Sequence, residues 1–459
     1  MHWRAVLLLV TALPHCEGPA GILPFHRSAG AMNKPGNTHT SIVDDREAKR
    51  SIGRSVHDHG AAQIDMLALR AYRLGRVQEQ LQVLDAAGAL FAEPNHIRYA
   101  TGVRNMQPWS MHTSFRTTFI PAQGKATAFE YGGSEHLATG LETIGEVRQA
   151  PPLFFSERNR ETGELDGRIA AWAAEIAELT RAAGGTRLAI DRHVDHFSAL
   201  ALEAAGLDLV SAARALTLAQ SIKSKEELLC LGASISVAEA AIHRLREALE
   251  PGMTEIELWA ILEGTNAEMG GEYLDTRLLS SGGRTNPWFQ EATDRVVRPG
   301  DLVALDTDMI GPFGYDADIS RTFLTPPNRP TGQQMELYQL AHEQLQHNLE
   351  LMRPGTTFRE MSEASYILPD KYREQEMVMV WHGVGLTGGA PNIVAKRYLT
   401  EYSDDGPVEP GLVLCCEAYV GELGGAEGVK LEQCAVVTET GYSLLTTFPF
   451  EEDLLGRQI

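Results

Sequence analysis

Apolar residues along this chain follow two different spacings, one typical of helices and one typical of strands. From about residue 66, segments with an apolar position every three or four residues alternate with short continuous apolar runs. The first spacing predicts helices over 67–87, 167–183 and 198–206, and the second predicts strands at 89–91 and 188–191. This alternation is typical of an α/β domain.

The second half of the chain opens with a long amphipathic helix. Apolar residues recur at helical spacing from residue 228 to residue 245, and Ser224 with Glu227 forms a capping-box pattern at the start. Thr254 and Glu257 repeat the capping pattern, so a second helix is expected directly afterwards. The segment 216–224 is expected to link the α/β domain to this half.

Two acidic residues follow the apolar run 302–305, and a third follows the next turn. Asp306 and Asp308 are two residues apart, so on a strand both carboxylates would point to one face. Asp318 comes after the Gly-Pro-Phe-Gly sequence at 311–314, which predicts a hairpin. The hairpin is expected to place Asp318 beside Asp306. Asp308 is expected either as a metal ligand or as a hydrogen-bond acceptor beside one.

Three more apolar runs carry His382, Glu417 and Glu432. An unpaired buried carboxylate costs several kcal/mol, and one cation can satisfy several acids at once. Considered singly, His382 could be a hydrogen-bonded core histidine, and each glutamate could pair with a basic residue such as Lys430. Considered together, the carboxylates and the imidazole predict a site for two divalent metals. The predicted ligands are Asp306, Asp308, Asp318, His382, Glu417 and Glu432.

In this order, the residues resemble the pita-bread metalloenzymes, the superfamily of methionine aminopeptidase, aminopeptidase P, prolidase and creatinase. The resemblance runs from about residue 67 to the C-terminus and includes the segments 93–102, 222–228, 251–255 and 299–301. It implies two divalent metal ions per subunit, with iron favoured and manganese, zinc or cobalt as alternatives. It also implies a homodimer.

The same resemblance implies an α/β (α+β) fold in two domains. An N-terminal extension is expected at 1–61, a creatinase-like domain at 62–218 and a pita-bread catalytic domain at 219–459. The length agrees, because 459 residues exceed what one ordinary hydrophobic core holds.

Two departures separate this chain from the peptidases of the superfamily. Those enzymes carry one histidine before the metal strand and another about seven residues after the ligand histidine, and both assist amide hydrolysis. Here Trp288 stands at the first place, and the segment 386–391 contains no histidine at the second. The segments 271–291, 306–308 and 382–386 resemble instead a non-peptidase branch, the DddP-type dimethylsulfoniopropionate lyases.

The lyase resemblance implies a metal-dependent β-elimination that cleaves dimethylsulfoniopropionate, or a similar small carboxylate, to dimethyl sulfide and acrylate. In these lyases an aspartate soon after the His-Gly-Val-Gly-Leu sequence removes the proton α to the carboxylate. Gly388 or Gly389 occupies that place here. Asp316, Tyr315 and Asp308 are nearest in sequence to the metal strands, and Asp316 is ranked first as the base.

Trp288 is a candidate wall for the sulfonium group of such a substrate, because an aromatic face attracts a cation. A buried core tryptophan is the alternative for this residue. Two other functions also stay open for the chain. One is an Xaa-Pro dipeptidase or aminopeptidase-type metallohydrolase, and the other is a non-catalytic metal-binding homologue.

Charge and cysteine content limit the partners and the compartment. A formal charge of -21 argues against nucleic acid or an anionic membrane as a partner, and no apolar run is expected to span a membrane. Five cysteines without paired spacing favour a reducing compartment. The first 20 residues resemble a signal peptide, but Met32 could be the true start. A cytoplasmic location is therefore expected, with a secreted or periplasmic one as the alternative.

Overall fold

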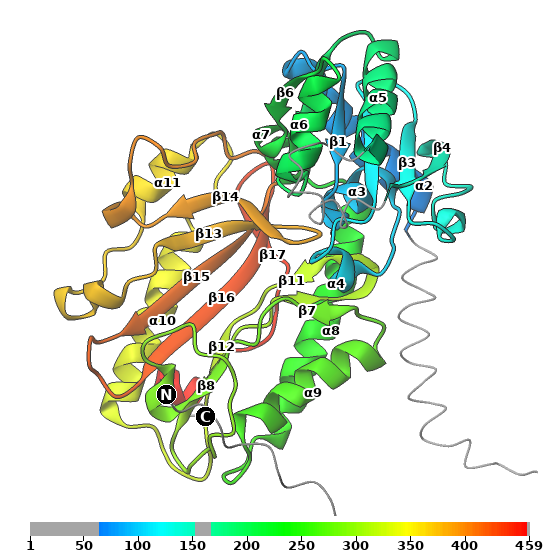
Figure 1. Cartoon of the computed structure of the whole chain (residues 1–459). Helices are drawn as coiled ribbons and strands as arrows, with labels where there is room; N and C mark the ends of the chain where they lie inside the picture. The colour runs from blue at the N-terminus through cyan, green and yellow to red at the C-terminus, as the bar shows by residue number, and fades with distance from the viewer. Residues whose placement is uncertain (1–63, 152–166, 457–459) are drawn as a thin grey trace, which may run out of the picture. The chain divides into compact units, whose positions relative to one another are not determined.

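The computed structural model describes residues 64–151 and 167–456. The predicted N-terminal extension, including its signal-like segment and Met32, lies outside the described residues. The first elements form one mixed sheet with the strand order β4-β3-β2-β1-β5-β6 (Figure 1). Its strands are β1 Gly88–Phe91, β2 Thr117–Pro121, β3 Ala126–Glu130, β4 Ile144–Gln149, β5 Arg187–Ile190 and β6 Asp208–Ser211. The helices of this part are α2 Met66–Val83, α3 Pro94–Thr101, α4 Gln107–Ser110, α5 Gly167–Ala182, α6 His196–Ala204 and α7 Ala213–Ser221.

The later elements form three further sheets and the helices that cover them. The sheets have the strand orders β11-β10-β7, β12-β9-β8 and β14-β13-β15-β16-β17. The strands are β7 Tyr273–Leu274, β8 Leu279–Ser281, β9 Leu302–Leu305, β10 Met309–Ile310, β11 Asp316–Ala317, β12 Arg321–Leu324, β13 Met379–Val384, β14 Gly388–Val394, β15 Val413–Gly421, β16 Gly428–Val437 and β17 Tyr442–Leu444. The helices are α8 Lys225–Ala248, α9 Glu255–Glu268, α10 Gly332–Leu349, α11 Phe358–Ala364 and α12 Glu452–Leu455.

The predicted helices and strands of the first part are confirmed, with ends that differ by a few residues. Both capping boxes are also confirmed, because Ser224 and Thr254 each accept the backbone N–H three residues later. The expected linking segment 216–224 is helical in its first part. Helix α7 continues to Ser221, and only a short extended segment separates it from α8. This helix also crosses residue 218, where the domain boundary is expected.

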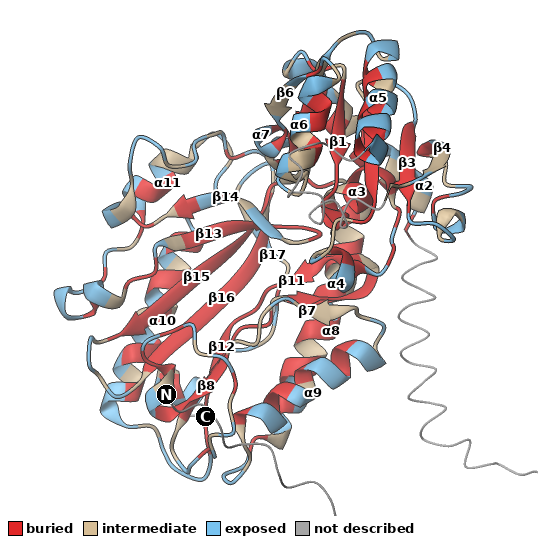
Figure 2. Cartoon of the chain, in the orientation of Figure 1, coloured by how far each residue is buried: buried red, intermediate tan, exposed pale blue. Residues whose placement is uncertain are grey.

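The five-stranded sheet supplies the rigid frame of the second half. Strands β15 and β16 pair in unbroken antiparallel register, which sets Glu417 directly opposite Glu432. Strand β13 pairs with the other side of β15, with His382 opposite Cys415. Strands β13, β15 and β16 are buried along most of their length (Figure 2). Helix α10 packs against β15 and β16 through the core that contains Leu345 and Leu414.

One described helix is long and apolar enough, by length and composition, to cross a membrane. This helix is α8, and its sequence is not an uninterrupted apolar run, because it contains charged residues such as Glu239 and Arg244. Half of its apolar window is buried inside the protein, and residues such as Leu231, Ile235 and Ile242 belong to the main hydrophobic core. The apolar face of α8 is therefore used in packing against α9 and the neighbouring strands.

Side-chain contacts connect the first sheet region to the second half. Arg98 on α3 donates two hydrogen bonds to Glu272, at 2.9 and 2.7 Å. Tyr99 on the same helix donates to the Ala219 carbonyl on α7, and Tyr72 on α2 donates to the Ile222 carbonyl. These contacts connect α2 and α3 to α7, to the segment before α8 and to Glu272, which directly precedes β7.

Candidate metal centre

Five of the six predicted ligands are buried residues on or beside neighbouring strands. Glu417 lies on β15 and Glu432 on β16, and their opposite register directs both side chains to one face of the sheet. His382 lies on β13, and Asp306 and Asp318 directly follow β9 and β11. The five side chains are at most 7% exposed. The structure thus brings together residues that are more than 120 positions apart in sequence.

The imidazole of His382 faces three carboxylates. Its Nε2 atom lies 3.5 Å from Asp318, 3.4 Å from Glu417 and 3.4 Å from Glu432. Its Nδ1 atom lies 3.2 Å from the Gly383 carbonyl. A proton on Nδ1 would be donated to that carbonyl, which leaves Nε2 free to bind a metal among the acids.

Lys430 lies inside the same group of acids. Its Nζ atom is 3.0 Å from Asp306, 2.9 Å from Glu417 and 3.2 Å from Glu432, and the residue is fully buried. From the sequence, Lys430 is expected only as a possible partner of a glutamate. Its position two residues before Glu432 on a strand could have indicated this, because residues i and i+2 share one face.

Asp306, Asp318 and Glu432 each offer an oxygen within 4.8 Å of the others. The expected hairpin is confirmed, because β10 pairs with β11 and brings Asp318 back beside Asp306. Ser320 joins this group, with Oγ 2.6 Å from Asp306 and 2.8 Å from Glu432. Its hydroxyl can donate to only one of these two carboxylates at a time.

Asp308 is placed differently from the prediction. Strand β9 ends at Leu305 and Asp308 has a positive φ of 35°, so the expected continuous strand through Asp306 and Asp308 is wrong. The Thr276 hydroxyl donates to its carboxylate at 2.6 Å, and its backbone N–H donates to Asp318 at 3.4 Å. Burial and the nearby Asp306 charge raise the pKa of Asp308 to about 7.

The charges in this centre do not balance. Burial raises the pKa of Asp306 and of Asp318 above the ordinary range, and neighbouring acids add to the effect. Burial opposes ionisation of His382, but the contact with Glu432 and the charge of Glu417 raise its pKa to about 10. The carboxyl groups of Asp306, Asp318, Glu417 and Glu432 thus share two basic partners, the Lys430 ammonium and the His382 imidazole.

This donor set fits divalent metal ions. Carboxylate oxygens with one imidazole nitrogen are suited to manganese, iron or zinc. Glu432 Oε1 is buried and makes no hydrogen bond within the part of the chain that the structure describes. Cys415 also lies close to His382 and Glu432, but burial raises the pKa of its thiol well above the ordinary range. The thiol form is a poor ligand, which leaves the carboxylates as the donors.

Asp316 lies beside the centre. It is 1% exposed, and its Oδ1 atom has no hydrogen-bond partner among the described residues. A Cβ atom added to Gly388 would lie 3.4 Å from Asp316 Oδ2. Burial, followed by the charge of Asp308, raises the pKa of Asp316 well above the ordinary range. The carboxyl therefore sits where a side chain at position 388 would point.

Tyr315 and Trp288, the other two candidates, differ in their distance from the acids. The Tyr315 hydroxyl donates to Glu227 on α8 at 2.9 Å, so the structure does not bring it to the acid group. Trp288 is 5% exposed and packs against Ala304, Met377 and Tyr419 in a small apolar cluster. Its ring centroid nevertheless lies 5.7 Å from Lys430 Nζ, so one face of this buried tryptophan borders the centre.

Comparison with known proteins agrees with this arrangement. Residues 230–439 match the family model of metallopeptidase family M24. The chain is 36% identical to dimethylsulfoniopropionate lyase DddP of Roseovarius nubinhibens, over 87% of this chain and 90% of that protein. The chain belongs to family M24, in the branch that includes DddP. A second DddP, from Roseobacter denitrificans, is 33% identical over 85% of this chain and 88% of that protein.

Solved structures show the same fold at lower sequence identity. An Xaa-Pro dipeptidase from Bacillus anthracis superposes with a TM-score of 0.67 at 21% identity, covering 83% of this chain and 99% of that one. A prolidase from Pyrococcus horikoshii gives 0.66 at 20% identity, with the same coverages. The predicted pita-bread fold with an N-terminal domain is therefore confirmed. Enzymes of family M24 bind divalent metals, and the acid group described above supplies the candidate ligands here.

Proposed function

We propose that this protein is a metal-dependent carbon–sulfur lyase that cleaves dimethylsulfoniopropionate, or a similar small carboxylate, to dimethyl sulfide and acrylate. Identities of 36% and 33% to two DddP enzymes, each over most of both chains, support this activity. The observation that supports this proposal most directly is the buried Asp316 carboxyl beside the metal centre. This carboxyl faces the position where the lyases place their base. A proton acceptor is therefore present although Gly388 has no side chain.

The proposed cofactor is a pair of divalent metal ions, with iron favoured over manganese, zinc or cobalt. Asp306, Asp318, His382, Glu417 and Glu432 would hold the ions, and Asp308 would ligate or accept a hydrogen bond beside them. Bound cations would stabilise the negative charge that develops on the substrate carboxylate.

Asp316 is the proposed general base. Its carboxylate takes the proton from the carbon α to the substrate carboxylate, and the C–H electron pair forms the new carbon–carbon double bond. The carbon–sulfur bond breaks at the β carbon, and its electron pair stays on sulfur, which neutralises the sulfonium. The products are acrylate, dimethyl sulfide and protonated Asp316. A raised pKa strengthens Asp316 as a base once it is ionised.

Trp288 is the proposed wall for the sulfonium group. One face of its ring already lies near the Lys430 ammonium, which supports an ability to face a positive charge. The burial of Trp288 against Tyr419 and Met377 would hold the ring in a fixed orientation. Tyr315 has no role in this proposal, because its hydroxyl bonds Glu227.

The test is headspace gas chromatography over the purified, metal-loaded protein supplied with dimethylsulfoniopropionate. Release of dimethyl sulfide in step with acrylate supports the lyase. Release of proline from Xaa-Pro dipeptides without dimethyl sulfide would instead support a peptidase. Bound metal without either product would support a non-catalytic homologue.

We also propose a homodimer in the cytoplasm. Resemblance to the two-domain members of the superfamily supports the dimer. The four cysteines in the described part of the chain are free and buried, which supports a reducing compartment. Size-exclusion chromatography with light scattering tests the first proposal, and fractionation of the source cells tests the second.

A further inference from the structure

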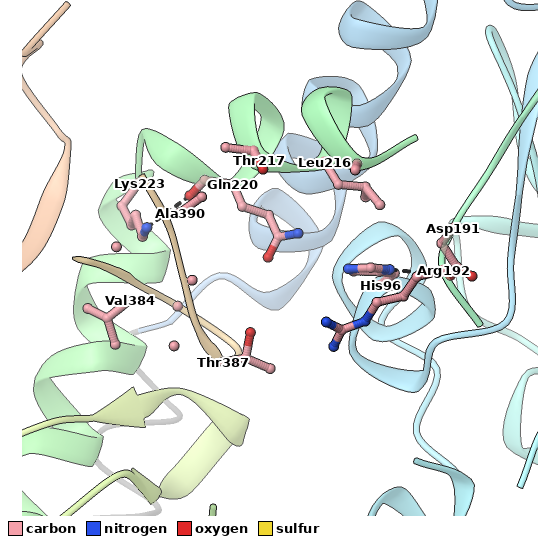
Figure 3. Close-up of a pocket in the computed structure, with 15 residues that line it drawn as sticks. His96, Asp191, Arg192, Leu216, Thr217, Gln220, Lys223, Val384, Thr387 and Ala390 are labelled. Carbon is pink, nitrogen blue, oxygen red and sulfur yellow. Dashed lines mark hydrogen bonds and ion pairs between the residues drawn. The ribbon is translucent and has the colours of Figure 1, made fainter. Parts of the chain in front are cut away.

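A cavity of about 240 Å³ lies between helix α7 and the β13–β14 hairpin (Figure 3). The lining includes Lys223 and Gln220 on one side, His96 and Arg192 on another, and Thr387 on the hairpin. None of the predicted metal ligands lines it, although the Gly383–Gly385 segment that follows His382 does. The cavity is therefore a neighbour of the metal centre with its own set of polar groups.

Lys223 brings a buried positive charge to this cavity. The residue is only 7% exposed, and its Nζ atom donates to two main-chain carbonyls, those of Gln220 at 2.9 Å and Ser221 at 3.4 Å. No acid lies within ion-pair distance of it among the described residues. An ammonium has three donors, so one donor is left over, and no ion pair among the described residues offsets the charge.

Arg192 adds a second positive charge. Its side chain is exposed, and it makes no hydrogen bond or ion pair with residues 64–151 or 167–456. The adjacent Asp191 makes no ion pair with it: the Asp191 carboxylate accepts the backbone N–H groups of Ala92, Glu93 and His193, and its Oδ2 atom lies 3.2 Å from His96 Nδ1. Figure 3 shows the guanidinium of Arg192 directed toward the space in front of Gln220.

We propose that this cavity binds a small monocarboxylate between the buried Lys223 ammonium and the exposed Arg192 guanidinium. The planar guanidinium matches the two oxygens of a carboxylate. Lys223 and Arg192 are the lysine and the arginine of the lining, and neither forms an ion pair among the described residues. Gln220 and Thr387 line the same space and can supply further hydrogen bonds.

The proposed ligand class agrees with the proposed function, in which substrate and product are both small carboxylates. The inference goes beyond that function, because the cavity would bind a carboxylate whether or not turnover occurs. Its hairpin also reaches the proposed base. The Gly385 carbonyl accepts the Asp316 backbone N–H at 2.7 Å, and Gly388 faces the Asp316 side chain.

The test is isothermal titration of acrylate into the full-length Glu432→Ala variant, whose altered metal centre separates binding in the cavity from turnover. We expect one saturable site per chain. Lys223→Met and Arg192→Gln, each added to Glu432→Ala, should weaken binding about 10- to 100-fold, as expected for loss of one charge-assisted hydrogen bond. Arg214→Gln, an equal change of charge at an exposed site on α7 outside the cavity, should leave the affinity unchanged.

Absence of saturable binding, or equal binding in all four proteins, would overturn the proposal. Tighter binding of inorganic phosphate than of acrylate would overturn the choice of a monocarboxylate. A crystal of the unmodified protein soaked in acrylate gives a measurement that needs no variant. Density for the carboxylate between Lys223 and Arg192 supports the site, and density confined to the metal centre contradicts it. A lack of dimethyl sulfide release would overturn only the proposed function.

Discussion

Two buried charged groups in this molecule differ in how their charges balance. In the N-terminal sheet, Arg116 lies 3.1 Å from Glu130, and both side chains are almost fully buried. Asn105 donates to the second oxygen of Glu130 at 3.1 Å, so this carboxylate is fully bonded. In the metal centre, four carboxylates surround Lys430 and His382, and an oxygen of Glu432 makes no hydrogen bond in the described structure.

This difference separates the Arg116–Glu130 pair, which has a structural role, from the metal centre, which has a functional role. One guanidinium beside one carboxylate is balanced in charge, because each partner offsets the desolvation of the other, although Nε and Nη2 of Arg116 make no hydrogen bond among the described residues. The metal centre holds more negative than positive charge. Burial raises the pKa of Asp306 and of Asp318, and the charges of neighbouring acids add to this effect. A cation from solution would remove this imbalance.

The largest expected effect comes from removing a carboxylate of the metal centre. Glu432→Ala deletes a fully buried acid that contacts both His382 and Lys430, so bound metal and lyase turnover should both fall below detection. Elemental analysis and dimethyl sulfide release measure the two losses. Glu439→Ala, at an exposed site just after β16, should change neither. Full turnover by metal-free Glu432→Ala protein would exclude a metal mechanism.

Removal of the proposed base should have a large effect on turnover alone. Asp316→Asn keeps the shape of the side chain but cannot accept the proton, so we expect a decrease in kcat on the order of 10²- to 10⁴-fold. Metal content should stay at the unmodified level.

Moving the carboxylate from position 316 to position 388 tests the same role in a second way. Gly388→Asp combined with Asp316→Ala puts the acid at the position that the lyase family uses, and the space beside Gly388 is open except for Asp316 itself. The double variant should recover part of the lost turnover. If Asp316→Asn keeps normal kcat, Asp316 is not the base.

Disruption of the balanced pair should affect stability and leave the metal centre intact. Glu130→Gln leaves the buried Arg116 charge without a partner, which costs about 3–5 kcal/mol of unfolding free energy. Urea denaturation measures this cost. Glu175→Gln removes a partner of Arg148 in an exposed pair and should cost at most about 1 kcal/mol. A loss of bound metal in Glu130→Gln would show that the two groups are coupled.

A further expected effect is a pH dependence of stability in metal-free protein. The pKa of Asp308 is about 7 in the folded chain, by burial and then Asp306, against about 3.9 for an unfolded aspartate. The folded state therefore binds the extra proton between these values, and stability falls as pH rises from about 4 to about 7. Tm measured after chelation should decrease across this range. Asp308→Asn should reduce the slope, and an unchanged slope would assign it to other acids.

Much of the fold could be predicted because its signals are local. The capping boxes at Ser224 and Thr254 and the turn at 311–314 each depend on a few neighbouring residues, and the structure contains all three. The helical form of residues 216–221 was not predicted, because α7 is held by contacts with α2 that no local pattern encodes. The expected strand through Asp308 failed because its backbone turns to positive φ before β10.

The order of the acids and His382 along the chain determined by itself which side chains form the centre, and it indicated the family. Only the tertiary structure decided that Lys430 lies among these acids, that Asp316 faces Gly388, and that Tyr315 turns away to Glu227. The physical reason is that residue type and spacing specify local geometry. Contacts between strands more than 70 residues apart depend on sheet register and packing, which no short segment contains.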